Sequence, residues 1–245
     1  MAENLNKNQK ERKLRIADLK VRLKYSGARL DKQSLGYVDD WTGETDVDVF
    51  VDDERLKKFC DKEKNVSMNL AEYILTGTQF YSKLIDYSGF MLHSSAVVYE
   101  GKAYLFSASC GTGKSTHTSL WLKRFGDAAV ILNDDKPAIR LVNDKFYAYG
   151  TPWSGKTDKQ TNMCVPIAAI AFIEQSENNS ITRMDTKTAI TSILSQTLKL
   201  RNISMIDFAL PTIEKLVKSI NVYKLRCNME LDAVDVAYEA MSKNL

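Results

Sequence analysis

Hydrophobic positions follow a helical period in five stretches of the chain. In the first stretch Leu70, Tyr73, Phe80 and Leu84 recur at near-helical intervals, which is typical of a helix with one apolar face. Pro211 suits the first turn of another stretch, because a first-turn residue needs no amide hydrogen for the helix. The pattern predicts helices over residues 69–85, 114–125, 186–199, 211–219 and 231–242.

Short runs of strand-forming residues, bounded by turn residues, lie among these helices. Asn143-Asp144 separates two of the runs and predicts a hairpin. Residues 46–49 alternate polar and apolar, which predicts a strand with one solvated face rather than a metal site. The other predicted strands are 95–99, 103–106, 128–132, 139–142, 146–149, 167–174, 181–184 and 222–226. Strands interleaved with helices indicate an α/β protein.

The character of the chain changes near residue 90, so we expect an N-terminal α+β region over 1–89 and a larger domain over 90–245. Residues 1–24 hold eight Lys or Arg against three acids. A basic arm for an acidic partner is one interpretation of this charge. We favour a solvated, partly frayed terminus, because charged tails are common.

Composition excludes few classes of protein, but it indicates which partners and which cellular compartment to expect. The chain has 245 residues, a formal net charge of +3 and 44% hydrophobic residues, so neither nucleic acid nor membrane is indicated as a partner. The longest apolar run, 167–173, is much shorter than the roughly 20 residues of a membrane span. The four cysteines form no C-x-x-C pair, which argues against zinc and favours free thiols in the cytoplasm.

A glycine-rich segment between the strand at 103–106 and the helix at 114–125 matches the phosphate-binding pattern G-x-x-x-x-G-K-[ST], except that Ala108 stands at its first glycine. Gly111 and Gly113 let successive amides turn inward around anionic oxygens. Lys114 is expected to contact the terminal phosphates, and Ser115 to bind Mg²⁺. The expected nucleotide-binding residues are Ser109, Cys110, Gly111, Thr112, Gly113, Lys114, Ser115 and Thr116.

Two acids follow the next apolar strand, at Asp134 and Asp135. A strand that ends in acids after a phosphate loop is typical of a site that holds a metal or activates a nucleophile. Neighbouring residues on an extended backbone point to opposite sides, so the two carboxylates are expected to have different tasks. A solvated turn is the alternative, since Asp-Asp is good turn chemistry.

Two further polar residues are candidates for the site. His93 comes just before the strand that leads to the phosphate loop; alone, such a histidine is more often structural than catalytic. Lys156 lies in the turn-rich segment 150–156 and is able to reach a phosphate or an acidic substrate, but it is equally well explained as a surface lysine.

Taken together, Leu92-His93-Ser94, the segment 108–115 and Asn133-Asp134-Asp135 resemble the catalytic core of HPr kinase/phosphorylase, and more distantly phosphoenolpyruvate carboxykinase. The segment 150–156 and the strand at 167–174 resemble HPr-kinase-like proteins found beside peptide-modification genes. The resemblance covers about residues 90–185. It implies a phosphoenolpyruvate carboxykinase-like P-loop core of mixed sheet with flanking helices.

The resemblance also implies roles. Asp134 matches the catalytic base, His93 the histidine that orients that base, and Asp135 a second acid near the metal. ATP and Mg²⁺ are the implied cofactors, and the acceptor is a serine-type hydroxyl on a peptide, protein or small molecule. The sequence carries no motif for base recognition, so GTP, ADP and pyrophosphate stay open as donors. Ala108 and Cys110 depart from the family's usual loop, and the family's C-terminal substrate signature is not recognisable. A carboxykinase-type lyase and a non-catalytic nucleotide sensor are the alternatives, and the oligomeric state stays open.

Overall fold

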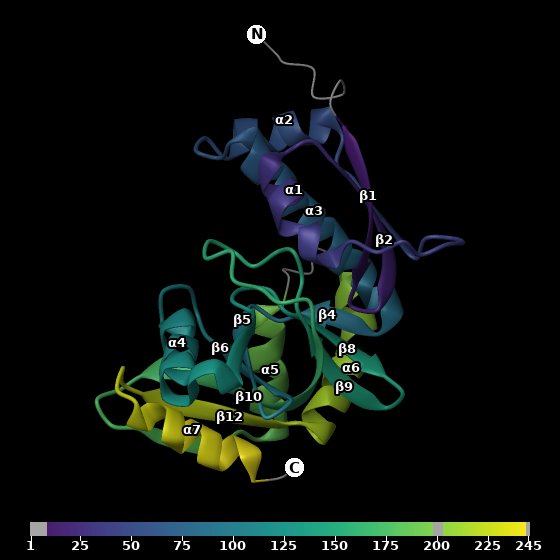
Figure 1. Ribbon diagram of the computed structural model, residues 1–245. Helices are drawn as coiled ribbons and strands as arrows, with labels where there is room; N and C mark the ends of the chain where they lie inside the picture. Colours follow the sequence, from purple (N-terminus) through teal and green to yellow (C-terminus); the bar gives the residue numbers. More distant parts are fainter. Residues whose placement is uncertain (1–8, 198–202, 244–245) are drawn as a thin grey trace. The chain divides into compact units, whose positions relative to one another are not determined.

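The computed structural model describes residues 9–197 and 203–243 (Figure 1). Contacts divide the chain into two units, Met1–Leu84 and Ile85–Leu245, and each is described by itself. Within the described ranges, no helix is both long enough and apolar enough to cross a membrane.

The first unit begins with a hairpin of β1 (Lys10–Ile16) and β2 (Leu19–Tyr25), and β3 (Val47–Val49) pairs in parallel with β2. The apolar residues of the hairpin are buried, while the Lys and Arg residues between them face outward. The frayed terminus predicted for 1–24 is therefore wrong over residues 10–24, and residues 1–8 lie outside the described part. The basic charge is the solvent face of an alternating pattern.

Three helices complete the first unit, together with a short 3₁₀ turn at Leu35–Tyr37. They are α1 (Ala28–Gln33), α2 (Asp53–Lys62) and α3 (Met68–Leu84), and α3 confirms the predicted helix. Asp52 caps α2 by accepting a hydrogen bond from the Arg55 amide at 2.7 Å. Leu56 of α2 packs against Ala71 and Leu75 of α3, so the two helices share a small apolar core.

The second unit contains one mixed sheet of nine strands. Its strand order is β4-β8-β9-β10-β6-β5-β7, and β12 pairs with β10 while β11 pairs with β12. The strands are β4 (Gly89–Met91), β5 (Ser94–Tyr99), β6 (Lys102–Ser107), β7 (Ala129–Asn133), β8 (Ala138–Val142), β9 (Lys145–Tyr149), β10 (Cys164–Gln175), β11 (Ser180–Arg183) and β12 (Asn221–Cys227). The long β10 links the antiparallel strands β4, β8 and β9 to the rest of the sheet. It is antiparallel to β9 at its start and parallel to β6 further along.

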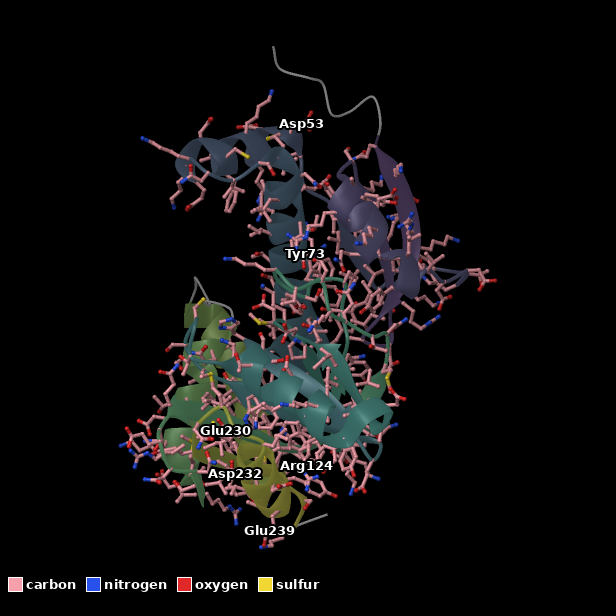
Figure 2. All side chains as sticks on the ribbon, turned by 60° about the vertical axis from the view of Figure 1, so that its left-hand side comes forward. Asp53, Tyr73, Arg124, Glu230, Asp232 and Glu239 are labelled. Atoms are coloured by element: carbon pink, nitrogen blue, oxygen red, sulfur yellow. The ribbon has the colours of Figure 1, made fainter. Side chains whose placement is uncertain are left out.

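Helices cover both faces of this sheet (Figure 1). α5 (Thr186–Gln196) and α6 (Ile203–Ser219) pack on one face, and α4 (Lys114–Phe125) and α7 (Asp232–Ser242) pack on the other. Arg124, labelled in Figure 2, pairs with Asp235 at 2.8 Å and links α4 to α7. The 3₁₀ turns Ile85–Tyr87 and Gly126–Ala128 lead into β4 and β7.

Pro211 lies inside α6 rather than in its first turn, so that prediction is wrong. A proline inside a helix removes one backbone hydrogen bond. Burial of Ala209, Ile213 and Leu216 against the sheet offsets that loss.

Strand pairing brings three chain segments to one edge of the sheet. β5 is antiparallel to both β6 and β7, with Ser94 opposite Ser107 and Ala96 opposite Asn133. The start of β5 therefore lies between the end of β6 and the end of β7. The phosphate-loop segment follows β6, His93 precedes β5, and the two aspartates follow β7.

Candidate functional site

The segment between β6 and α4 forms a turn that glycine alone adopts easily. Gly111 has φ +81° and Gly113 has φ +116°, both in the left-handed region that favours glycine. Gly113 is the N-cap of α4 and makes no side-chain cap, and the first turn of α4 carries no acid. Its amides and the positive end of the helix dipole therefore suit an anion.

Lys114 is buried beneath this turn. Its Nζ donates hydrogen bonds to the backbone oxygens of Ala108 at 2.9 Å and Ser109 at 3.2 Å. Burial lowers the pKa of Lys114, while the nearby charge of Asp135 acts in the opposite direction. The ammonium is thus held inside the turn, close to the groups on which a phosphate would lie.

The remaining predicted nucleotide-binding residues surround Lys114 with different exposure. Ser115 is half-buried at the start of α4, and Gln175 donates a hydrogen bond to the Thr112 oxygen at 3.2 Å. The exposed residues are Ser109, Cys110, Gly111 and Thr116. The structure therefore brings the predicted set together on one loop and helix start.

The two aspartates are directed to different surroundings. Asp134 is 5% exposed, and its Oδ1 accepts a hydrogen bond from Ser95 Oγ at 2.5 Å. Asp135 Oδ1 lies 3.2 Å from His93 Nε2, and Lys136 forms an ion pair with the same carboxylate. Burial alone would raise the pKa of Asp135, but the His93 hydrogen bond and the Lys136 charge outweigh it and lower that pKa to about 2.

His93 therefore contacts Asp135, not Asp134 as the resemblance implied. The reason is that adjacent side chains at the end of a strand point to opposite sides. Gln196, the last residue of α5, contacts His93 through its backbone and its side chain. The His93 amide donates to the Gln196 oxygen at 2.7 Å, and His93 Nδ1 lies 3.2 Å from Gln196 Oε1. His93 and Asp135 form one pair at the sheet edge.

Asn133 fixes the backbone at Asp135 and Lys136, a role that was not predicted from the sequence. Its Oδ1 accepts hydrogen bonds from the amides of Asp135 at 3.0 Å and Lys136 at 2.7 Å. Its Nδ2 donates to the oxygen and hydroxyl of Thr151, both at 3.1 Å. The signal was present in the sequence, because Asn commonly bonds its own backbone two or three residues later in a turn.

The loop at 150–161 closes over Asp135. A Cβ added to Gly155, which has φ +72°, would lie 2.6 Å from Asp135 Cβ. Lys156 is exposed on this loop, and its predicted substrate role stays a prediction. Lys136 follows Asp135 directly and forms an ion pair with it, although the sequence pattern did not single it out.

The predicted Mg²⁺ fits some of these residues better than others. In the part of the chain that is described, no three His, Cys, Asp or Glu side chains are grouped to hold a metal, but Mg²⁺ commonly uses one or two carboxylates with substrate phosphates. Asp134 Oδ2 is buried and has no hydrogen-bond partner among the described residues. Asp134 therefore has an unbonded carboxylate oxygen that fits such a cation, whereas Asp135 is already engaged by His93 and Lys136. The metal role of Ser115 stays a prediction.

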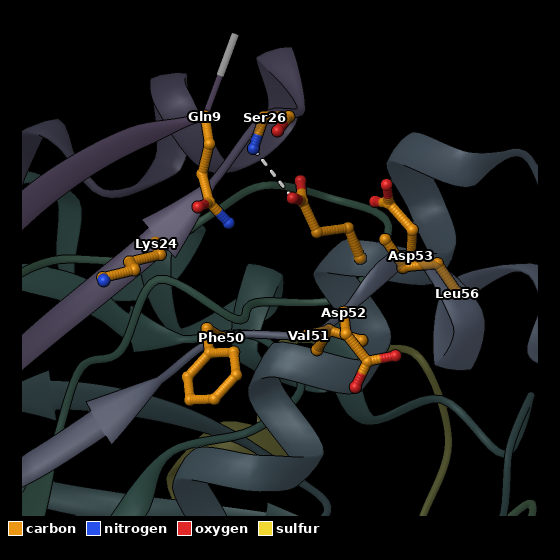
Figure 3. A pocket seen from close by; sticks show the side chains of 9 residues that line it. Gln9, Lys24, Ser26, Phe50, Val51, Asp52, Asp53 and Leu56 are labelled. Carbon is orange, nitrogen blue, oxygen red and sulfur yellow. Dashed lines mark hydrogen bonds between the residues drawn. The ribbon is translucent and has the colours of Figure 1, made fainter. Parts of the chain in front are cut away.

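A separate cavity of about 280 Å³ lies in the first unit (Figure 3). It is bounded by the end of β2, residues 50–53 and Glu72 of α3. Glu72 accepts hydrogen bonds from the amides of Ser26 at 2.8 Å and Gly27 at 2.7 Å. None of the predicted site residues lines this cavity.

Comparison with known proteins gives one family and a distant fold. Residues 56–232 match a family model described as "SynChlorMet cassette protein ScmC". No curated protein matches the sequence. The Hpr(Ser) kinase/phosphatase from Coxiella burnetii is similar in structure at a TM-score of 0.37 and 11% identity, over 61% of this chain and 93% of that chain.

Proposed function

The chain belongs to the family of the SynChlorMet cassette protein ScmC, and on that premise we propose that it is a Mg²⁺-dependent kinase that transfers the terminal phosphate of ATP to a hydroxyl. One observation carries the proposal. A left-handed glycine turn, a buried lysine and two carboxylates lie at a single edge of one mixed sheet. This combination supplies both phosphate binding and a proton acceptor.

Charge stabilisation is the task of the loop and α4. The turn amides, the start of α4 and Lys114 offset negative charge on the phosphate oxygens as it builds up in the transition state. Ser115 and Asp134 would hold Mg²⁺, which neutralises further phosphate charge when bound. In this assignment Asp134 faces the phosphate side, because Ser95 ties it to α4.

Acceptor activation is the task of the His93–Asp135 pair. Asp134 Oδ2 is assigned to the cation, whereas the Asp135 side chain, paired with His93, is 22% exposed. We therefore exchange the roles that the resemblance implied. The acceptor oxygen forms a bond to the terminal phosphorus, the bond from that phosphorus to the bridging oxygen breaks, ADP leaves, and the His93–Asp135 pair takes the hydroxyl proton.

A mass-spectrometric search tests this function. The full chain is incubated with ATP, Mg²⁺ and peptides encoded by neighbouring genes, and we expect one peptide to gain a phosphate. Lys114→Ala should lose this transfer, because the buried ammonium that offsets phosphate charge is removed. Lys123→Ala, an exposed lysine on the same helix, is the matched control. Turnover of Lys114→Ala close to that of the control would overturn the proposal.

The same experiment separates the alternatives. Tight ATP binding without any ADP would favour a nucleotide sensor, and oxaloacetate-dependent formation of phosphoenolpyruvate would favour the lyase. The structure gives little support to the alternative of a carboxykinase-type lyase. His117, the second histidine of the chain, is 2% exposed and accepts a hydrogen bond from Trp121 Nε1 at 3.2 Å, so His93 alone is left for the site.

A further inference from the structure

A buried row of two hydroxyls ends on Asp134. Thr118 Oγ1 lies 2.7 Å from Ser95 Oγ, and Ser95 Oγ lies 2.5 Å from Asp134 Oδ1. Thr118 and Ser95 are both 0% exposed. Each residue comes from a different element, since Thr118 is on α4, Ser95 on β5 and Asp134 just after β7. The row therefore connects the phosphate-loop helix to the acid across the intervening strand.

The direction of these hydrogen bonds follows from counting hydrogens. An ionised carboxylate only accepts hydrogen bonds, so Ser95 gives Asp134 its single hydroxyl hydrogen. The Ser95 oxygen is then the acceptor for Thr118. Thr118 Oγ1 also lies 3.3 Å from the backbone oxygens of Lys114 and Ser115, which are its alternative acceptors. The bond to Ser95 is the shorter and aligns the row toward the acid.

Packing alone does not call for these hydroxyls. Ser95 lies in a strand among buried apolar residues, and Thr118 lies on the face of α4 that meets the sheet. Alanine and valine fill such positions with no polar group to satisfy. The hydroxyls cost desolvation unless they are bonded. Ser95 donates to the Asp134 carboxylate, and Thr118 is linked to that carboxylate through Ser95. Ser95 is also the one side chain that bonds either oxygen of this carboxylate among the described residues.

We propose that Ser95 and Thr118 are positioning residues that hold the Asp134 carboxylate toward the Mg²⁺–phosphate centre. Ser95 fixes Oδ1 by donation and leaves Oδ2, which has no hydrogen-bond partner in the described structure, for the cation. Thr118 fixes the Ser95 hydroxyl and ties the acid to the turn of helix that carries Lys114 and Ser115. This inference rests on the proposed function and deepens it.

The test measures ATP affinity by calorimetry with Mg²⁺ and with chelator in its place. In the parent chain Mg²⁺ should strengthen ATP binding. Ser95→Ala should lose about 10- to 100-fold of that Mg²⁺-dependent gain, which is the usual effect of removing an outer hydrogen bond to a metal ligand. Metal-free ATP affinity should stay unchanged, because the loop amides and Lys114 are untouched. Thr118→Val should act in the same direction by less.

Conservative variants and a matched control decide between positioning and packing. Thr118→Ser keeps the hydroxyl and should recover the parent's gain. Ser94→Ala removes a neighbouring buried hydroxyl that bonds the Leu92 oxygen and should behave as the parent. Two results would overturn the inference. One is a Ser95→Ala chain whose ATP affinity rises with Mg²⁺ as much as the parent's. The other is a Thr118→Ser chain whose Mg²⁺-dependent rise in ATP affinity is as small as that of Thr118→Val. A parent chain that binds no ATP would instead overturn the proposed function.

Discussion

At the residue scale, site residues that are close in sequence could be predicted, but contacts between side chains from distant segments could not. The spacing of the glycines, Lys114 and Ser115 places them on one loop in any strand-loop-helix unit. The sequence also indicated that Asp134 and Asp135 diverge. It did not indicate which of them meets His93, because that depends on how β5, β7 and α5 pack.

His117 gives a prediction at the same scale. Burial lowers its pKa to about 4, against about 6.5 for an unfolded chain. Between these values the unfolded chain binds the extra proton, so stability is present above about pH 6.5 and is lost as pH falls toward 4, by up to about 3 kcal/mol. His117→Gln keeps an acceptor for Trp121 and should flatten this dependence in urea unfolding at pH 7 and pH 4.5. Equal slopes in both chains would contradict the assignment.

At the element scale, the prediction was accurate where periodicity was strong. The predicted helices and strands of 90–245 are confirmed within the described residues, apart from the early start of α6 and the end of α5 at Gln196. Residues 198–199 of the predicted helix 186–199 lie outside the described part. β1 and β2 were missed because the count of basic residues outweighed their alternation with Leu14, Val21 and Leu23. Charge describes the solvent face of a strand as readily as it describes a tail.

The loop that covers Asp135 provides the element-scale prediction. Gly155→Ala places a methyl group against Asp135, whereas Gly101→Ala has the same backbone strain at φ +71° and nothing within 4 Å. Both should lose about 1 kcal/mol of stability from the left-handed conformation, measured by thermal unfolding. Only Gly155→Ala should also lose phosphoryl transfer, because it displaces the acid–histidine pair. Equal loss of transfer in the two variants would show that the loop does not position Asp135.

At the scale of the whole molecule, the order of strands in the sheet determines which residues meet at the site. This order cannot be predicted from the sequence patterns. β5 is inserted between β6 and β7, so the aspartates do not follow the strand next to the phosphate loop. Ser95, on β5, bonds both Thr118 of α4 and Asp134 after β7. Local patterns predict each element, but pairing between distant strands depends on packing that a single sequence does not display.

Equilibrium ATP binding by the parent, Lys114→Ala and Lys123→Ala chains tests the central claim most directly. Lys114 is held inside the turn by two backbone oxygens, and a hydrogen bond to a charged group contributes about 1.5–3 kcal/mol. We predict that Lys114→Ala binds ATP about 10- to 100-fold more weakly than the parent, while Lys123→Ala binds like the parent. Equal affinity in all three chains would contradict a phosphate site at this turn.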